Sequence, residues 1–90
     1  MIIGKVVGNV WATKKDPKLE GRKLLVVKTS AAGSPETIVA VDTIGAGVGE
    51  DVLIAKGSVA RNAIGDPGSP VDAVIVGIID SLEVNKNLLK

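Results

Sequence analysis

The 90-residue sequence contains no cysteine, histidine, phenylalanine or tyrosine, and it contains one tryptophan. Without cysteine, no disulfide can stabilise a small domain. Without cysteine or histidine there is no thiolate nucleophile, no Ser-His-Asp triad and no ordinary zinc site. A single aromatic side chain also gives no row of platforms on which bases could stack. These absences argue against the common hydrolase classes, against a structural metal or cofactor and against a stacking surface for single-stranded nucleic acid.

Strong charge of either sign is also missing. The 11 basic and 10 acidic residues give a net charge of +1, which predicts no attraction to nucleic acid or to an anionic membrane. The basic residues between 14 and 23 are interrupted by Asp16 and Glu20, a pattern typical of a solvated loop. The longest uncharged apolar run, residues 73–79, is too short to span a bilayer, and no signal peptide is visible. We therefore expect a cytoplasmic protein.

Apolar residues are abundant for a chain of this size. They make up 46% of the sequence, and the mean hydropathy is +0.36. A domain of 90 residues buries a limited fraction of its surface and is often marginally stable alone. We expect one domain over residues 1–81, a C-terminal tail over residues 82–90, and association of several copies to cover the excess apolar surface.

The pattern of β-branched runs and turn residues predicts an all-β fold. Five strand-like segments are separated by Gly, Pro, Ser and Asp clusters; they cover residues 2–13, 23–29, 37–43, 51–56 and 71–79. One short helix is predicted over residues 59–64, with Ser58 as its N-cap and Gly65 as a left-handed stop. This set of elements suggests a small five-stranded barrel of the oligonucleotide/oligosaccharide-binding (OB) type.

The two faces of the first strand differ in composition. Its even positions from Ile2 to Ala12 are all apolar or small, and its odd positions mix apolar and polar side chains. We therefore expect the even positions to face the barrel interior and the odd positions to form an interface. The segments 24–27, 38–41 and 52–55 are apolar on both faces, so we expect another subunit to cover the second face. Trp11 is either an anchor of such an interface or an ordinary packing residue.

The glycine-rich stretch from Gly45 to Glu50 lies between two of the predicted strands. Phosphate-binding glycine loops precede a helix, because the helix N-terminus supplies the amides. A strand follows here, so we expect the glycines to shape a backbone loop that another chain can approach closely.

Arg61 falls in the first turn of the predicted helix, where the helix dipole disfavours a cation. It is either a tolerated surface residue or a partner of a carboxylate or carbonyl at a subunit contact.

Several of these motifs, in this order, resemble the bacterial microcompartment vertex family of the EutN/CcmL type. The resemblance is carried by the segments 8–13, 19–27, 41–50, 57–61 and 70–80. It covers nearly the whole chain, from residue 1 to about residue 81. Val59 is one departure, at a position where the family often has a small polar residue.

This resemblance implies an OB-like barrel that assembles as a cyclic homopentamer. It further implies a non-enzymatic role at the five-fold vertices of a polyhedral shell, with hexameric facet proteins as partners. Residues 47–50 are more similar to members from catabolic compartments than to those from carboxysomes. Interface positions that we expect from the resemblance and from the residues themselves are Trp11, Gly45, Ala46, Gly47, Gly49, Glu50, Ser58 and Arg61.

The glycine-rich loop is expected where the pentamer meets hexamers, and Glu50 could there pair with a basic residue of a facet protein. Contact with the ring axis is the alternative placement. The tail either extends the last strand, crosses to a neighbour or frays.

Three other functions compete with a vertex role. The barrel fold permits nucleic-acid binding, although the charge and the missing aromatics argue against it. A co-chaperonin-like ring is another small barrel oligomer, but the turn between Thr29 and Glu36 is short for a loop that grasps a partner. An enzyme would need a carboxylate pair, and no spacing singles one out among Asp42, Glu50, Asp51, Asp66 and Asp72. Hydrogen bonding at turns and strand ends is the expected role of these carboxylates.

Overall fold

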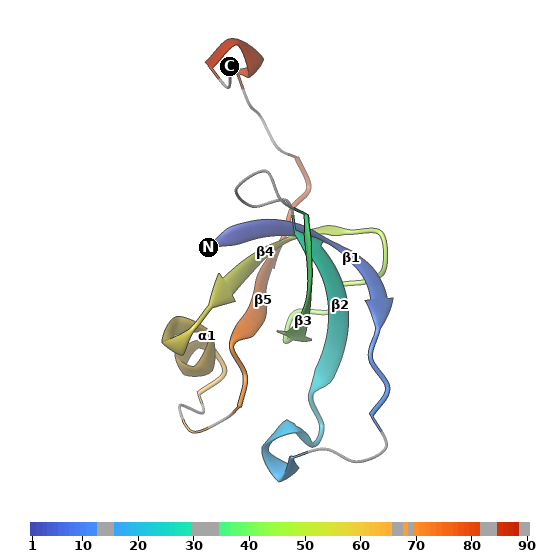
Figure 1. The fold of residues 1–90 in the computed structure, drawn as a ribbon, viewed down its shortest axis with the longest axis vertical. Coiled ribbons are helices and arrows are strands. Elements are labelled where there is room, and N and C mark those ends of the chain that lie inside the picture. The colour runs from blue at the N-terminus through green and yellow to red at the C-terminus, as the bar shows by residue number, and fades with distance from the viewer. Residues whose placement is uncertain (13–15, 30–34, 66–67, 69, 82–84, 89–90) are drawn as a thin grey trace.

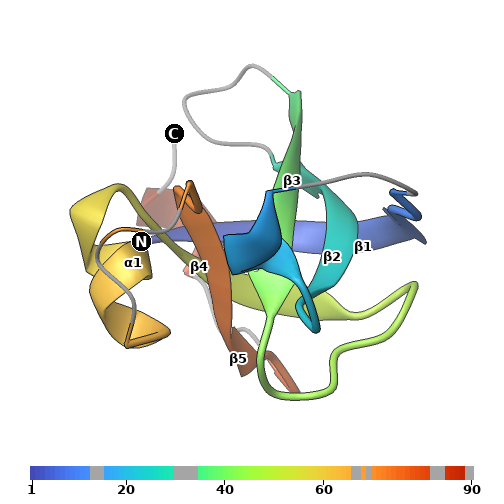
Figure 2. The same ribbon diagram turned by 90° about the horizontal axis from the view of Figure 1, so that it is seen from below.

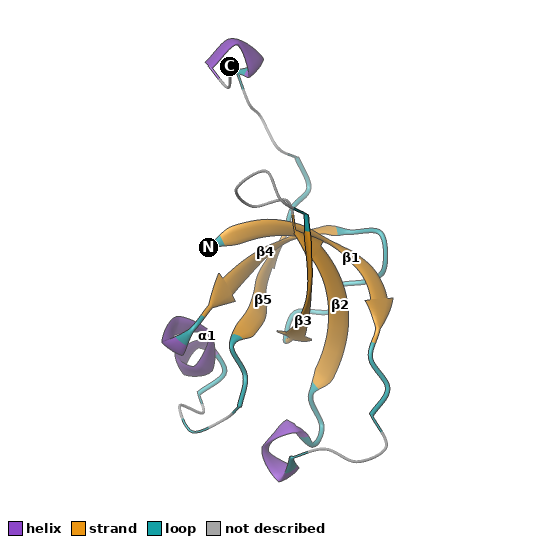
Figure 3. Cartoon of the chain, viewed as in Figure 1, coloured by secondary structure: helices purple, strands orange, loops and turns teal. Residues whose placement is uncertain are grey.

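A computed structural model describes residues 1–12, 16–29, 35–65, 68, 70–81 and 85–88. Five strands close into a barrel in the order β1-β2-β3-β5-β4 (Figures 1 and 3). The elements, in chain order, are β1 (Ile2–Asn9), η1 (Pro17–Leu19), β2 (Lys23–Thr29), β3 (Glu36–Asp42), β4 (Asp51–Lys56), α1 (Ser58–Ala63), β5 (Ala73–Ile78) and η3 (Lys86–Leu88). The prediction of a five-stranded barrel with one short α-helix is confirmed.

Antiparallel pairing joins every neighbouring pair of strands except β3 and β5. These two strands run parallel and share a short register in which Val41 faces Val74 and Asp42 faces Ile75. A parallel pair needs a crossover connection. Here the crossover consists of the glycine-rich loop, β4 and α1, so the loop and the helix both result from the way in which the barrel closes.

The barrel interior is filled by small and branched aliphatic side chains. Its fully buried members include Val6, Leu25, Val27, Val52, Ile54 and Ile75. Along β1 the even positions Gly4 and Val6 are buried and the odd positions Ile3, Lys5 and Val7 are exposed. The prediction that even positions face the barrel interior is therefore confirmed for Gly4 and Val6, and it is wrong for Ala12, which is exposed beyond the end of β1. The prediction that the odd positions form an interface stays a prediction.

A second apolar cluster lies outside the sheet, on the face opposite to the barrel interior. It contains Val41, Ala60, Val71 and Val74, and the half-buried side chains of Leu19, Leu24 and Ile64 pack against it. The chain therefore covers part of its own outer face with α1 and η1. The expectation that another subunit covers the second face of segment 38–41 is wrong for Val41, because a cluster of this chain's own residues, including Ala60 of α1 and Leu19 of η1, buries it. It stays open for Val39, which is 49% exposed.

Three of the five strands differ in their bounds from the prediction. Strand β1 ends at Asn9 and not at Thr13, a residue outside the described part of the chain. The register shifts between Val6 and Gly8, and Val10 makes the last bond to β2, with its N–H 3.0 Å from the Leu24 carbonyl oxygen. Strand β3 lies one residue earlier than predicted. Strand β5 lacks Val71, Asp72 and Ile79 from the predicted span, and Val71 packs in the outer cluster.

The helix begins one residue earlier than predicted. Gly57 is the N-cap of α1, and Ser58 is its first residue, so the assignment of Ser58 as N-cap is wrong. The Gly57 carbonyl accepts from the N–H of Ala60 at 3.1 Å, and no side chain caps the helix. Gly65 has a φ of +74° after the helix, which confirms the predicted left-handed stop. No helix in the described ranges has the length and apolar character needed to cross a bilayer.

Little of the tail can be compared with the prediction. Glu83, Val84 and Leu89, for which we predicted strand extension or a crossing to a neighbour, lie outside the described residues. Leu88 belongs to the one-turn element η3, so it does not extend β5. The division into a barrel over residues 1–81 and a tail over residues 82–90 stays a proposal.

Candidate functional site

The loop between β3 and β4 is held to the barrel by Ala46. This side chain is completely buried and belongs to the interior cluster with Val52 and Ile54. Gly45 and Gly49 on either side have φ values of +84° and +94°, a region that side chains with a Cβ rarely adopt. Figure 2 shows the loop, in light green, projecting from the barrel between β3 and β4. The glycines therefore serve first to turn the loop's own backbone around a buried anchor.

The second half of the loop is hydrogen bonded to β1 and to itself. The Gly49 N–H donates to the Val6 carbonyl at 2.8 Å, and the Val6 N–H donates to the Glu50 carbonyl at 3.0 Å. Within the loop, the Gly47 N–H donates to Glu50 Oε1 at 2.6 Å, and the Glu50 N–H donates to the Gly47 carbonyl at 3.1 Å. These bonds make the exposed segment from Gly47 to Glu50 a defined tight turn. Such a segment can present a fixed surface to a partner.

Lys23 and Asp42 connect the loop to β2 and β3. The two residues face each other across the β2–β3 ladder, and Lys23 Nζ lies 3.3 Å from Asp42 Oδ2 and 2.8 Å from the Ala46 carbonyl oxygen. Asp42 Oδ1 accepts from the Ile44 N–H at 3.1 Å. The Asp42 side chain is 1% exposed and that of Lys23 is 50% exposed. Asp42 Oδ2 accepts no hydrogen bond of good geometry. The nearby Lys23 ammonium group therefore stabilises its negative charge by electrostatic attraction.

This role of Lys23 is not visible in the sequence. The sequence pattern groups Lys23 with the basic residues of a solvated loop, and that prediction is wrong for this residue. Its partner Asp42 lies 19 residues away, so only the strand register could have paired them. The expected strand-end hydrogen bonding of Asp42 is confirmed by its bond to the Ile44 N–H.

Substitution of Lys23 by methionine should lower the free energy of unfolding by about 1–3 kcal/mol, because it leaves a buried carboxylate and a carbonyl without their donor. The double variant Lys23→Met/Asp42→Asn should be more stable than Lys23→Met alone, since a neutral amide costs less to bury without a cation. Urea unfolding of the four members of this double-mutant cycle measures the coupling. Additive effects would contradict the proposed link.

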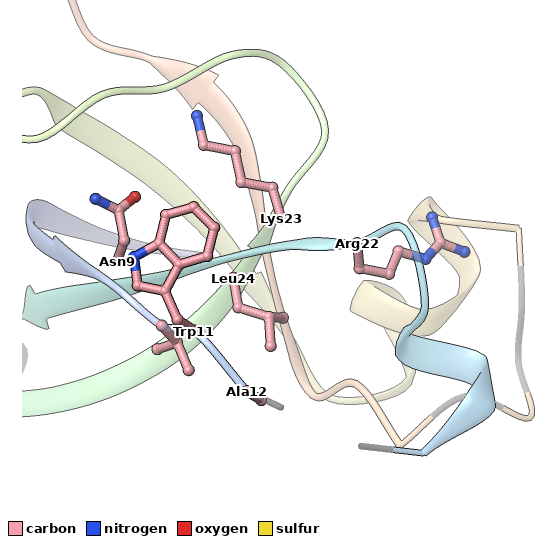
Figure 4. Close-up of a pocket in the computed structure, with 7 residues that line it drawn as sticks. Asn9, Trp11, Ala12, Arg22, Lys23 and Leu24 are labelled. Carbon is pink, nitrogen blue, oxygen red and sulfur yellow. The ribbon is translucent and has the colours of Figure 1, made fainter. Parts of the chain in front are cut away.

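Trp11 lies at the mouth of a hollow between the end of β1 and the start of β2. The hollow measures about 330 Å³, and its lining includes Asn9, Trp11, Lys23 and Leu24 (Figure 4). The Trp11 side chain is 91% exposed, so it is not an ordinary packing residue of the isolated chain. Lys23 lines this hollow together with Trp11, and its Nζ also donates to the Ala46 carbonyl. Trp11 and the glycine-rich loop therefore lie in one region of the surface.

The remaining predicted interface residues lie elsewhere. Ser58 and Arg61 belong to α1, which lies on the side of the barrel away from the loop between β3 and β4 (Figures 1 and 2). The guanidinium Nη1 of Arg61 donates to the Val71 carbonyl of the same chain at 3.4 Å. Arg61 therefore meets a carbonyl, as one hypothesis expected, but this bond lies within the chain. A subunit contact of Arg61 or Ser58 stays a prediction.

The described side chains offer no recognisable catalytic arrangement. They contain no group of three His, Cys, Asp or Glu side chains that could hold a metal ion. The half-exposed Lys23 and the buried Asp42 form an ion pair that holds the loop, and Glu50 accepts a hydrogen bond from a backbone amide. What the surface does offer is a rigid loop, an exposed tryptophan and exposed aliphatic side chains on a small barrel. These are features of an assembly surface.

Comparisons with known proteins agree with an assembly role. The family described as "Ethanolamine utilisation protein EutN/carboxysome" matches residues 1–80. The chain is 48% identical over 88 residues to the bacterial microcompartment shell vertex protein GrpN of Rhodospirillum rubrum, with 92% of this chain and 97% of that protein covered. It is 46% identical over 87 residues to the carboxysome shell vertex protein CcmL of Synechocystis, with 93% and 87% covered.

A solved structure supports the same relationship. It is described as the GrpN pentameric microcompartment shell protein from Rhodospirillum rubrum. It matches the present fold with a TM-score of 0.80 at 44% identity, covering 94% of this chain and all of that chain.

Proposed function

Because this chain belongs to the EutN/CcmL family and is a shell vertex protein of bacterial microcompartments, we propose that five copies form a ring that occupies each five-fold vertex. The role is structural and not enzymatic, as in the named relatives. A flat hexagonal layer cannot close without five-fold points, and a ring of identical subunits with head-to-tail contacts supplies them. The observation that carries the proposal is the match of residues 1–80 to a family with a pentameric shell protein among its close relatives.

Native mass measurement tests the ring. The chain has a mass of 9.2 kDa, so a closed ring of five is well separated from a monomer or dimer. We expect the ring to be the main species at micromolar concentration. A chain that stays monomeric or dimeric under these conditions would count against the vertex role.

We further propose that the shell belongs to a catabolic compartment. The support is the sequence of residues 47–50, which is more similar to catabolic members, although the relatives include both GrpN and CcmL. Co-expression with facet proteins from a catabolic operon and, separately, from a carboxysome operon tests this. Closed shells should form only with the catabolic set, as judged by electron microscopy. Closure with the carboxysome set alone would reverse the assignment.

Hexameric facet proteins are the proposed partners of the loop between β3 and β4. Val48, Gly49 and Glu50 are exposed, and hydrogen bonds to β1 fix the backbone around them. A partner can therefore contact backbone groups whose positions do not depend on long side chains. Nucleic acid and membranes are not proposed as partners, because the net charge is only +1. An electrophoretic shift with nucleic acid at low salt would contradict this.

Gly47→Asp should prevent shell closure while leaving the pentamer intact. A Cβ at this position lies 3.4 Å from Glu50 Oε1, so the new carboxylate repels Glu50 and changes the surface that facet proteins meet. Gly47→Ala fills the same space without charge and is the matched control. Native mass measurement reports the pentamer, and electron microscopy of co-expressed shells reports closure. Loss of the pentamer in Gly47→Asp but not in Gly47→Ala would place the loop at a subunit contact.

A further inference from the structure

The outer surface of the barrel exposes aliphatic side chains in two groups, one on β1 and one on the neighbouring strands β3 and β5. On β1, Ile3 and Val7 are 41% and 48% exposed. On β3, Val39 is 49% exposed, and on β5, Val76 is 39% exposed. In the closed order β1-β2-β3-β5-β4, strand β2 separates the two groups on one side and β4 separates them on the other. The two groups therefore face different directions. A ring with head-to-tail contacts needs two different surfaces on each subunit.

Each of these surfaces has a hollow beside its exposed side chains. The β1 face borders a hollow of about 320 Å³, lined by residues that include Ile3, Val7 and Lys28. The β3 face borders a hollow of about 170 Å³, lined by residues that include Leu24, Val39 and Val71. Apolar atoms dominate the surface of both hollows. Side chains that project from one face therefore have apolar space to enter on the other.

The charges of the two faces are complementary. Lys5 and Lys28 face each other across the β1–β2 ladder, a pairing of like charges that is unfavourable unless an anion approaches. Asp51 lies 3.8 Å from Lys5 and compensates one of the two charges, which leaves the face with one net positive charge. The charged residue that lines the hollow of the β3 face is Asp72. Among the described residues, neither Lys28 nor Asp72 has an ion pair within the chain.

We propose that the outer face of β1 of one copy packs against the outer face of β3 of the next copy around the ring. The occupant of each apolar face is therefore a second copy of this chain. This assignment rests on the proposed pentamer and adds which surfaces close it. It leaves the glycine-rich loop available for facet proteins, because Ala46 and the bonds to β1 hold the loop on its own subunit.

Two matched variants test the pairing. Ile3→Asp damages the β1 face and Val39→Asp damages the β3 face, at positions of similar exposure. Each should be mainly monomeric by native mass measurement where the unsubstituted chain is pentameric. The concentration for half assembly should rise roughly 10-fold or more, because a carboxylate is desolvated at every contact. Val48→Asp, on the loop that this assignment leaves outside the ring contact and at a position 59% exposed, is the control and should stay pentameric.

The equal mixture of the two variants gives the sharpest result. An Ile3→Asp subunit keeps its β3 face, and a Val39→Asp subunit keeps its β1 face, so one intact contact can form between them. The mixture should therefore produce a dimer and nothing larger. If instead the β1 face packed against another β1 face and the β3 face against another β3 face, no complex would contain both variants. If each variant remains pentameric, these two faces do not form the ring contact.

Two further measurements distinguish a lost contact from a folding defect and from a chain that never forms a ring. Far-UV circular dichroism should show that both variants are folded; if either is not, Ile3→Ser and Val39→Ser should give the same pattern with smaller shifts. An unsubstituted chain that is monomeric contradicts the proposed function together with this assignment. A pentameric unsubstituted chain whose two variants are also pentameric contradicts the assignment alone.

Discussion

Ala46→Asp is expected to lower the free energy of unfolding by about 3–5 kcal/mol, because it places an uncompensated carboxylate in the barrel interior. The Ala46 side chain is 0% exposed and packs among Val52 and Ile54. The nearby ammonium group of Lys23 is already engaged by Asp42 and by the Ala46 carbonyl. Val48→Asp, two residues along the same loop and 59% exposed, should change the stability by less than about 0.5 kcal/mol. Urea unfolding compares the two.

The same pair of variants tests whether Ala46 anchors the loop. If the carboxylate escapes by pulling the loop out, the bonds between β1 and the loop break, and hydrogen exchange at the Val6 and Gly49 amides should accelerate. Val48→Asp should leave this exchange unchanged. Equal stability and equal exchange in the two variants would contradict the role of Ala46 as the anchor.

Gly4→Ala is expected to destabilise the barrel by about 1–3 kcal/mol through overpacking. A Cβ at this position would lie 2.5 Å from Val27 Cγ1 and 3.1 Å from both Ile54 Cδ1 and the Lys28 carbonyl oxygen. The strand and a fully buried side chain would have to move apart. Gly8→Ala is the matched control on the same strand, because its nearest contact would be 3.8 Å away at Val26. It should stabilise the protein by about 0.5 kcal/mol, since glycine costs conformational entropy in a strand.

Urea unfolding of both glycine variants provides the measurement. A larger loss for Gly8→Ala than for Gly4→Ala would mean that Gly4 does not approach the barrel interior closely. The comparison also separates two uses of glycine in one strand. Gly4 leaves space for the core, whereas Gly8 lies at the register shift where β1 bends along β2.

The sequence was sufficient to predict the strands, their number and the inward face of β1. The reason is that alternation along a strand is a local property, visible in Gly4 and Val6 against Lys5 and Val7. The resemblance of whole segments to a known family added the pentameric vertex role, which composition alone did not supply. The glycine-rich stretch was also interpretable as a loop, because the residues after Glu50 have the pattern of a strand.

Other features depend on contacts between distant residues and could not be predicted locally. Val41 and Val74 are buried in a cluster that brings together Ala60 of α1, Val71 and Leu19 from distant parts of the chain, so apolar strands with two buried faces did not require a partner everywhere. The link from Lys23 to Asp42 follows from the β2–β3 register. The N-cap was misplaced by one residue because serine is a strong local signal, whereas Gly57 reaches the required backbone angles without any side chain.

The closed ladder of the barrel has a consequence for the life of a subunit before assembly. Each of the five strands has a neighbour on both sides, so no strand is open along a whole side. The shortest seam lies between β3 and β5, which pair only at Val41 with Val74 and at Asp42 with Ile75. Open sheet edges are the usual templates for runaway β-aggregation. A newly made subunit therefore meets its ring partners mainly through exposed apolar side chains, and the backbone groups open to strand addition are concentrated at the seam between β3 and β5.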